Sequence, residues 1–191
     1  MLETATRLMQ SGVTPSVSEV AEAAGVSRAT AYRYFPSQAA LVHAVVDKAL
    51  GPILTWHSAS EDAEERVSDL IEFSMPRIEA FEATFKAALK LSLEQWAQRQ
   101  SGSLDDEPQF KRGHRVDLLR KALAPLRAEL SRDQIDRLVQ ALSLVFGVEV
   151  LIVLKDIWGM DGRRAQAVTR WAAGALVRGA IAEARAKGQR I

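Results

Sequence analysis

The residues best suited to chemistry are Arg28, Ala29 and Thr30, which open a short segment of helical pattern. An arginine guanidinium can donate two hydrogen bonds to guanine, and the methyl group of threonine can contact the methyl group of thymine. Tyr32 and Arg33 follow one turn later, where their polar groups are placed to bind phosphate oxygens. This set of side chains predicts a surface that binds duplex DNA.

Two short helices joined by a turn are needed to position these side chains. Ser16 and Glu19 have the S-x-x-E spacing of a capping box, which starts the first helix. Gly25 suits the left-handed residue that ends this helix, and Ser27 is a good N-cap for the second, which Pro36 ends. The pattern favours a helix-turn-helix over two ordinary surface helices. The residues predicted to face inward from the second helix are Ala31, Tyr34 and Phe35.

The segment from Gly25 to Leu41, GVSRATAYRYFPSQAAL, resembles the signature of the TetR family of bacterial transcriptional regulators. The strong resemblance covers residues 2 to about 46. It implies base contacts from Arg28, Ala29 and Thr30, and phosphate contacts from Ser16, Ser18, Tyr32 and Tyr34. The full set of DNA-binding residues expected from the motif and the resemblance is Ser16, Ser18, Ser27, Arg28, Ala29, Thr30, Tyr32, Arg33, Tyr34 and Gln38.

Two features of this segment depart from the family pattern. Gln38 stands where the family often has a lysine that meets phosphate at the start of the fourth helix. The chain also opens almost directly into its first helix, without the longer basic arm that is common in the family. Residues 1–50 carry no net charge, because four basic residues are balanced by four acidic ones. Electrostatic attraction to DNA should therefore be modest.

The composition is that of an ordinary soluble protein, with 191 residues, 48% hydrophobic content and a net charge of +1. The absence of cysteine excludes disulfides and thiolate metal sites. No signal peptide or membrane-spanning run is recognisable, so the sequence predicts a cytoplasmic protein with no membrane partner. The three histidines lie in no metal-binding spacing, and no acid, base and nucleophile converge. We expect no cofactor, no metal and no enzymatic activity.

Helical periodicity runs through the whole chain and predicts an all-α fold. A three-helix helix-turn-helix head is expected at residues 1–46, followed by a larger carboxy-terminal helical bundle at residues 47–191. A helix over about 38–50 is expected to pack on both the head and this bundle. The other helices of the bundle are expected at about 63–74, 109–123, 131–158 and 163–187, with one more opening at Pro76. The segment from Ala141 to Leu154 is apolar on nearly all sides, which predicts a widely buried helix.

The last two helices are predicted to form a homodimer interface. Small residues on the final helix would let another helix approach closely, and two such helices from each chain would make a four-helix interface. The resemblance implies dimerisation in the same place. The stripe of small and apolar residues comprises Ala165, Val168, Ala172, Ala175, Leu176 and Gly179.

A pocket for a small effector is the second expectation for the bundle, and an ordinary packed core is the alternative. Glu149 is a carboxylate in an apolar helix, which leaves three possibilities: it binds a ligand, it pairs with an arginine such as Arg170, or it lies at a wet rim. The residues expected to bind the effector are Phe81, Phe85, Trp96, Phe110, His114, Phe146 and Glu149.

Together these features predict a transcriptional regulator, best described as a ligand-responsive repressor. It would bind inverted-repeat, double-stranded operator DNA as a homodimer and be released by an unidentified small effector. Two other classes remain open on the sequence alone. A helical enzyme would need convergent catalytic groups, and a structural DNA-associated or adaptor protein would lack an effector cavity.

Overall fold

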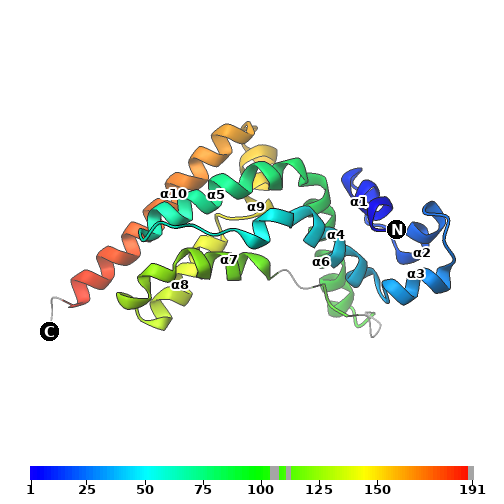
Figure 1. The fold of residues 1–191 in the computed structure, drawn as a ribbon, viewed down its shortest axis with the longest axis horizontal. Helices are drawn as coiled ribbons and strands as arrows, with labels where there is room; N and C mark the ends of the chain where they lie inside the picture. The colour runs from blue at the N-terminus through cyan, green and yellow to red at the C-terminus, as the bar shows by residue number, and fades with distance from the viewer. Residues whose placement is uncertain (104–107, 111–112, 189–191) are drawn as a thin grey trace. The chain divides into compact units, whose positions relative to one another are not determined.

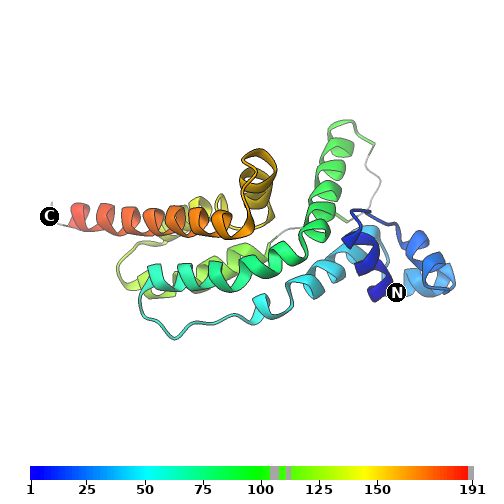
Figure 2. The same cartoon turned by 90° about the horizontal axis from the view of Figure 1, so that it is seen from above.

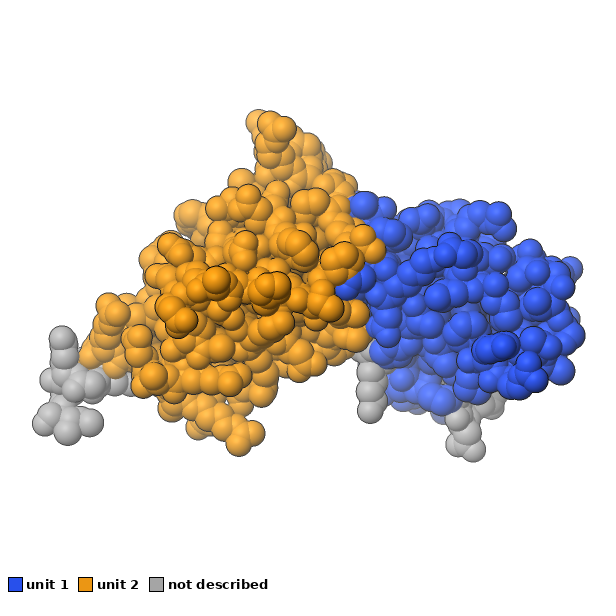
Figure 3. Space-filling view, viewed as in Figure 1, with its two compact units in different colours: residues 1–51, 80–112 blue, residues 52–79, 113–191 orange. Residues whose placement is uncertain are grey.

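The structure is a computed structural model that describes residues 1–103, 108–110 and 113–188. All the secondary structure in these residues is helical, which confirms the predicted all-α fold (Figure 1). The chain forms two compact units, one of residues 1–51 and 80–112 and the other of residues 52–79 and 113–191 (Figure 3).

The first unit contains the amino-terminal helices and one helix from later in the chain. Helices α1 and α4 pack on each other and on α6, while α2 packs on α3. Buried side chains at the centre of this unit include Ala5, Val20 and Leu41 together with the larger Met9, a mixture that fills the space between closely packed helices. The helices are α1 (Leu2–Gln10), α2 (Val17–Ala23), α3 (Arg28–Tyr34), α4 (Gln38–Leu50) and α6 (Glu82–Gln100).

The second unit is built mainly on α5, α7, α8 and α10. Helix α8 packs against α7 and α10, and its core residues Leu138 and Leu142 are almost completely buried. Its elements, with the 3-10 turn η1 that connects α4 to α5, are η1 (Gly51–Thr55), α5 (Ala63–Ala80), α7 (His114–Ala122), η2 (Ala124–Ala128), α8 (Arg132–Ser143), α9 (Val148–Leu151), the π-helical segment η3 (Ile152–Ile157) and α10 (Gly162–Gly188).

The predicted helix starts are confirmed where a polar cap marks them. The Ser16 hydroxyl accepts the Glu19 N–H at 3.2 Å, and the Glu19 carboxylate accepts the Ser16 N–H at 2.6 Å, completing a capping box. Ser131 and Gln134 form a second box at the start of α8. The helix predicted at 38–50 is α4, which Ser37 caps through the Ala40 N–H.

Helix α5 does not end before Pro76, so the prediction of a new helix there is wrong. The helix continues to Ala80, and α6 begins only at Glu82. A proline inside a helix leaves the carbonyl four residues earlier without its usual donor. Here that carbonyl belongs to Glu72 and accepts a hydrogen bond from Gln166 Nε2 at 3.4 Å. The contact with α10 compensates for the missing N–H.

The helix predicted at 109–123 is shorter than expected, because α7 begins only at His114. Phe110 precedes the helix and is buried in the first unit, where it contacts α6. Its backbone N–H donates to the Gln95 side-chain oxygen at 2.8 Å, and Gln95 is itself buried on α6. The first residues of the predicted span are therefore held in the first unit rather than in a helix.

The predicted long helix 131–158 is broken, and this prediction is also wrong. Helix α8 ends at Ser143, and α9 begins at Val148 after Gly147, whose φ of 120° and ψ of −169° are accessible essentially only to glycine. The two halves are bent by 43°. Several apolar residues of this stretch, including Leu144 and Val153, are exposed instead of buried. Within the described residues, no single helix could cross a membrane by length and composition, although this bent pair taken together could.

Arg115 braces the break between α8 and α9. Its guanidinium donates to the Ser143 carbonyl at 3.1 Å and to the Glu149 carboxylate at 2.5 Å. Of the three possibilities raised for Glu149, the pair with an arginine is the one observed, but the partner is Arg115 and not Arg170. Both side chains remain partly exposed, so the pair is not a fully buried one.

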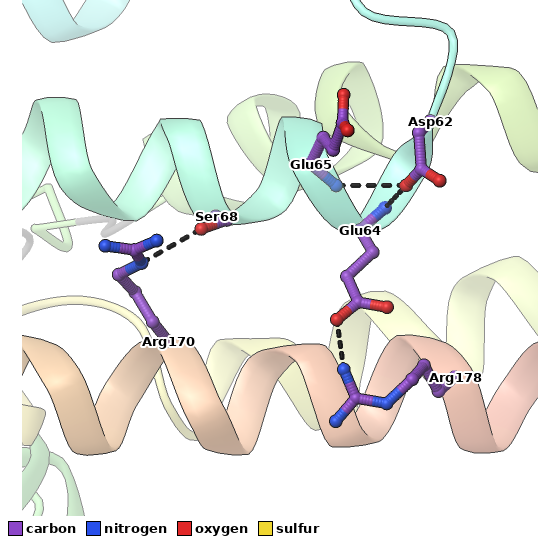
Figure 4. A network of polar contacts seen from close by, with 6 residues as sticks. All are labelled: Asp62, Glu64, Glu65, Ser68, Arg170 and Arg178. Atoms are coloured by element: carbon purple, nitrogen blue, oxygen red, sulfur yellow. Dashed lines mark hydrogen bonds and ion pairs between the residues drawn. The ribbon is translucent and has the colours of Figure 1, made fainter.

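Arg170 instead joins α10 to α5, which run side by side (Figures 2 and 4). Its guanidinium donates to Ser68 Oγ at 2.9 Å and pairs with Glu72 at 3.2 Å. Arg178 forms a further ion pair with Glu64 on the next turns of the same two helices. The acidic side of α5 lines a hollow of about 470 Å³ here, and these two arginines neutralise part of its charge.

Candidate nucleic-acid interface

Helices α2 and α3 form the predicted helix-turn-helix. Gly25 has a φ of +67°, the left-handed conformation that lets the chain turn between the helices. Ser27 caps α3 by accepting the Thr30 N–H at 3.2 Å. Ala21 and Ala31 are completely buried, and their small size allows the two helices to approach closely. The caps, the glycine and the alanines together fix the direction of α3.

The exposed face of α3 carries the residues predicted to contact DNA. Arg28, Ala29 and Arg33 are exposed, and Thr30 is half-buried at the edge of this face. Among the described residues, the Arg28 side chain has no ion-pair or hydrogen-bond partner, so its guanidinium donors are available. The amino-terminal turn of a recognition helix is the part that reaches base edges in the major groove.

Tyr34 lies outside the core, which corrects the prediction that it faces inward. It is 65% exposed, and the Arg33 guanidinium lies 5.5 Å from the centre of its ring. Helix α3 ends at Tyr34, and Phe35 turns away with extended backbone angles. Phe35 is therefore the half-buried ring, while the Tyr34 side chain stays on the surface next to Arg33.

Two pairs of hydroxyl groups link neighbouring residues of this surface. Ser18 Oγ on α2 lies 3.3 Å from the Tyr32 hydroxyl on α3, and the two groups share a hydrogen bond. Ser27 Oγ donates to Thr30 Oγ1 at 3.0 Å. Ser16 is half-buried at the start of α2, where it caps the helix. The polar groups predicted to contact phosphate thus lie along the α2–α3 pair in fixed positions.

Gln38 points toward the loop before α2. Its amide nitrogen donates to the carbonyl of Thr14 at 3.2 Å and to that of Pro15 at 3.1 Å. Thr14 Oγ1 in turn donates to the Ala87 carbonyl of α6 at 3.4 Å. No sequence signal predicted these contacts, because they join residues that are distant in the chain.

Two carboxylates of this unit titrate below their ordinary range. The Ser16 backbone N–H, followed by the Ser16 side chain, holds the pKa of Glu19 below its usual value. A hydrogen bond from Lys48, together with its charge, lowers the pKa of Glu3. The Lys48–Glu3 pair also joins α4 to α1. A lowered pKa means that the folded state favours the charged carboxylate.

The Glu19 pKa leads to a pH prediction. Because the pKa is lower in the folded than in the unfolded state, the stabilisation is present at neutral pH and is lost as the pH falls through the folded pKa. We expect Glu19→Gln to be less stable than the parent at pH 7 and to approach it at acidic pH. Urea unfolding of both proteins across this range measures the difference, and a gap that stays constant with pH would contradict the assignment.

The residues predicted to bind an effector are divided between the two units. Phe81, Phe85, Trp96 and Phe110 belong to the first unit, and His114, Phe146 and Glu149 to the second. Phe85, Phe110 and Phe146 are buried, whereas Trp96 is 56% exposed. In the second unit, a hollow of about 240 Å³ includes one of them and is lined by Leu54, His114, Asp117, Leu118 and Lys121.

Comparisons with known proteins identify the amino-terminal unit. Residues 1–45 match the model for bacterial regulatory proteins of the tetR family, and these residues include the whole helix-turn-helix. Residues 1–45 therefore form a DNA-binding domain of the TetR family of transcriptional regulators. This match supports a role as a DNA-binding transcriptional regulator.

The fold of the whole chain is similar to a solved TetR transcriptional regulator from Rhodococcus sp. RHA1. The TM-score is 0.62, with 21% sequence identity over 92% of each chain. At this identity the similarity concerns the fold alone. No curated protein sequence matches the chain. The TetR resemblance predicted from residues 25–41 is thus confirmed by the family model, and the helical body by the fold.

Proposed function

We propose that this TetR regulator is a cytoplasmic, ligand-responsive repressor that binds inverted-repeat operator DNA as a homodimer. Functionally, residues 1–46 would bind DNA and residues 47–191 would hold the effector site and the dimer interface. The observation that carries the proposal is a set of large apolar side chains exposed on the last helices. The head, for its part, presents one reading helix per chain. A single reading helix binds palindromic DNA when it is doubled by symmetry.

The exposed apolar residues support a dimer through the last two helices. Trp171 on α10 is 72% exposed, and Leu144, at the end of α8, is 79% exposed. Exposed apolar groups of this size are costly in water and mark protein interfaces when they gather on one region. The remaining members of the set are Val153, Ile157, Trp158 and Val168.

The spacing along α10 suits a helix of a second copy. Val168, Trp171, Ala175 and Gly179 recur every three or four residues and therefore share one face. A side chain added at Gly179 would meet no other atom within 4 Å, so the surface is open there. Small residues beside a large indole allow a helix to pack closely around a central anchor. We therefore assign this face to the partner's α8, α9 and α10, the region that the sequence predicted as the last two helices.

For DNA, we propose that Arg28, Ala29 and Thr30 contact bases and that Ser16, Ser18, Ser27, Tyr32, Arg33 and Tyr34 contact the backbone. The exposure of the α3 residues and the unpartnered Arg28 guanidinium support this division. Since residues 1–50 have no net charge, affinity should depend on these local contacts and on the doubling of the site by dimerisation.

This division predicts different effects for two substitutions on α3. Arg28→Ala should relax the preference at one base pair in each half-site, at a cost of about 1–3 kcal/mol for that pair. Tyr32→Phe removes one hydroxyl that is placed to bind phosphate, so it should lower the affinity for DNA of every sequence to a similar extent. Affinities measured on single-base variants of a selected site decide the matter, and unchanged base preference in Arg28→Ala would contradict its role as a reader.

The effector part of the proposal centres on the hollow that includes His114. Leu54 and Leu118 give it apolar walls, while His114, Asp117 and Lys121 supply hydrogen-bonding groups, the mixture found in small-molecule sites. A ligand releases DNA only if it has a higher affinity for the conformation that cannot bind DNA than for the conformation that can. The test is a screen of small molecules for release of a fluorescent duplex. Release that Leu118→Trp abolishes would support this site, and release unaffected by that change would place the effector elsewhere.

A further inference from the structure

We propose that Gln38 is a positioning residue, which holds the start of α2 for phosphate binding and does not itself bind phosphate. Its primary amide carries two N–H groups and no other donor. Both are directed at protein carbonyls, one at Thr14 and one at Pro15. A phosphate oxygen accepts hydrogen bonds and cannot bind the remaining amide oxygen. The donors needed for a phosphate contact are therefore already used.

The two carbonyls lie immediately before the cap of α2. Pro15 is buried and precedes Ser16, whose hydroxyl and backbone take part in the capping box with Glu19. The same loop is also held by the hydrogen bond from Thr14 Oγ1 to the Ala87 carbonyl on α6. Gln38 thus fixes the backbone from which the first turn of α2 starts.

The first turn of α2 carries the group that depends on this placement. Ser18 lies there and shares a hydrogen bond with the Tyr32 hydroxyl of α3. If the loop shifts, Ser18 moves relative to Tyr32, and two hydroxyl groups proposed to contact phosphate lose their common geometry. The inference rests on the proposed function, in which the chain binds DNA and Ser18 contacts a phosphate group.

Gln38→Met tests the proposal, since it keeps the size of the side chain and removes both donors. Losing these hydrogen bonds should weaken binding of a selected duplex about tenfold for all sequences. In a Ser18→Ala background the same change should cost less than about threefold, because the group that it misplaces is gone. If the loss of DNA affinity in the double variant equals the product of the two single losses, the two residues act independently and the proposal is overturned.

A second measurement uses the free protein and is independent of DNA. The Ser16 and Glu19 amides close the capping box, so Gln38→Met and Gln38→Glu should both speed their hydrogen exchange while the α3 amides stay unchanged. If only one of these two variants folds, its hydrogen exchange alone is sufficient for the test. Gln38→Lys is the matched control: its ammonium can donate to the same carbonyls and should keep exchange close to wild type. Unchanged exchange in the donor-free variants, or equally fast exchange in Gln38→Lys, would overturn the positioning role even if DNA binding is confirmed.

Discussion

Gly147→Ala is expected to destabilise the protein by about 3 kcal/mol, one of the largest effects of any single substitution here. The backbone angles at this position belong to a region that non-glycine residues avoid. A Cβ built there would also lie 2.9 Å from the Arg115 guanidinium nitrogen, closer than real contacts allow. The substitution therefore forces either the α8–α9 break or its Arg115 brace to move.

Urea unfolding of four variants, Gly147→Ala, Arg115→Ala, their double variant and Gly113→Ala, separates these two causes. In an Arg115→Ala background the closest contact is removed, and the backbone strain and a 3.2 Å approach to Glu149 Oε2 remain, so Gly147→Ala should cost less there than in the parent. Gly113→Ala is the control, because its φ is negative and an added Cβ meets no atom within 4 Å. A Gly147→Ala protein as stable as the Gly113→Ala protein would show that the break is not held in the conformation described.

Trp171→Arg is expected to convert the proposed dimer to monomers and to lower affinity for an inverted repeat by about two to four orders of magnitude. The indole is 72% exposed on α10, and a charge at the centre of a helix interface has no compensating partner. Affinity for an isolated half-site should hardly change, since α3 is untouched. Molecular mass from light scattering and binding to whole and half sites provide the measurements.

Trp96→Arg is the matched control for this experiment. Trp96 is also an exposed tryptophan, but it lies on α6, outside the last two helices. The same change of residue type should leave the mass and the preference for the whole site unaltered. If Trp171→Arg remained dimeric, or if both variants dissociated alike, the proposed interface would be wrong.

Sequence predicted the parts of this fold that are controlled locally. The starts of α2, α3, α4 and α8 follow from polar caps within three residues of the helix, and Gly25 marks the turn directly. The candidate DNA surface was predicted for the same reason, because the exposed face of a short helix follows from its periodicity. The exception was Tyr34, which lies where the helix ends and periodicity no longer applies.

Errors arose where a distant residue decides the structure. Pro76 did not end α5 because Gln166, far along the chain, supplies the missing donor to Glu72. The α8–α9 break depends on Gly147 and on Arg115 from another helix, and neither the break nor the Arg115–Glu149 pair has a local signal. The apolar stretch around Leu144 was interpreted as buried within one chain. Its exposure in the single chain is what a partner subunit would explain.

Selection of bound duplexes from a random pool tests the central proposal most directly. We expect the selected DNA to contain two copies of one half-site in inverted orientation, with centres separated by a multiple of about 34 Å, and to bind two protomers. Twofold symmetry in the DNA would reflect twofold symmetry in the protein. Selected sites without inverted repeats, or complexes with a single protomer on each duplex, would contradict a dimeric regulator that reads DNA with Arg28, Ala29 and Thr30.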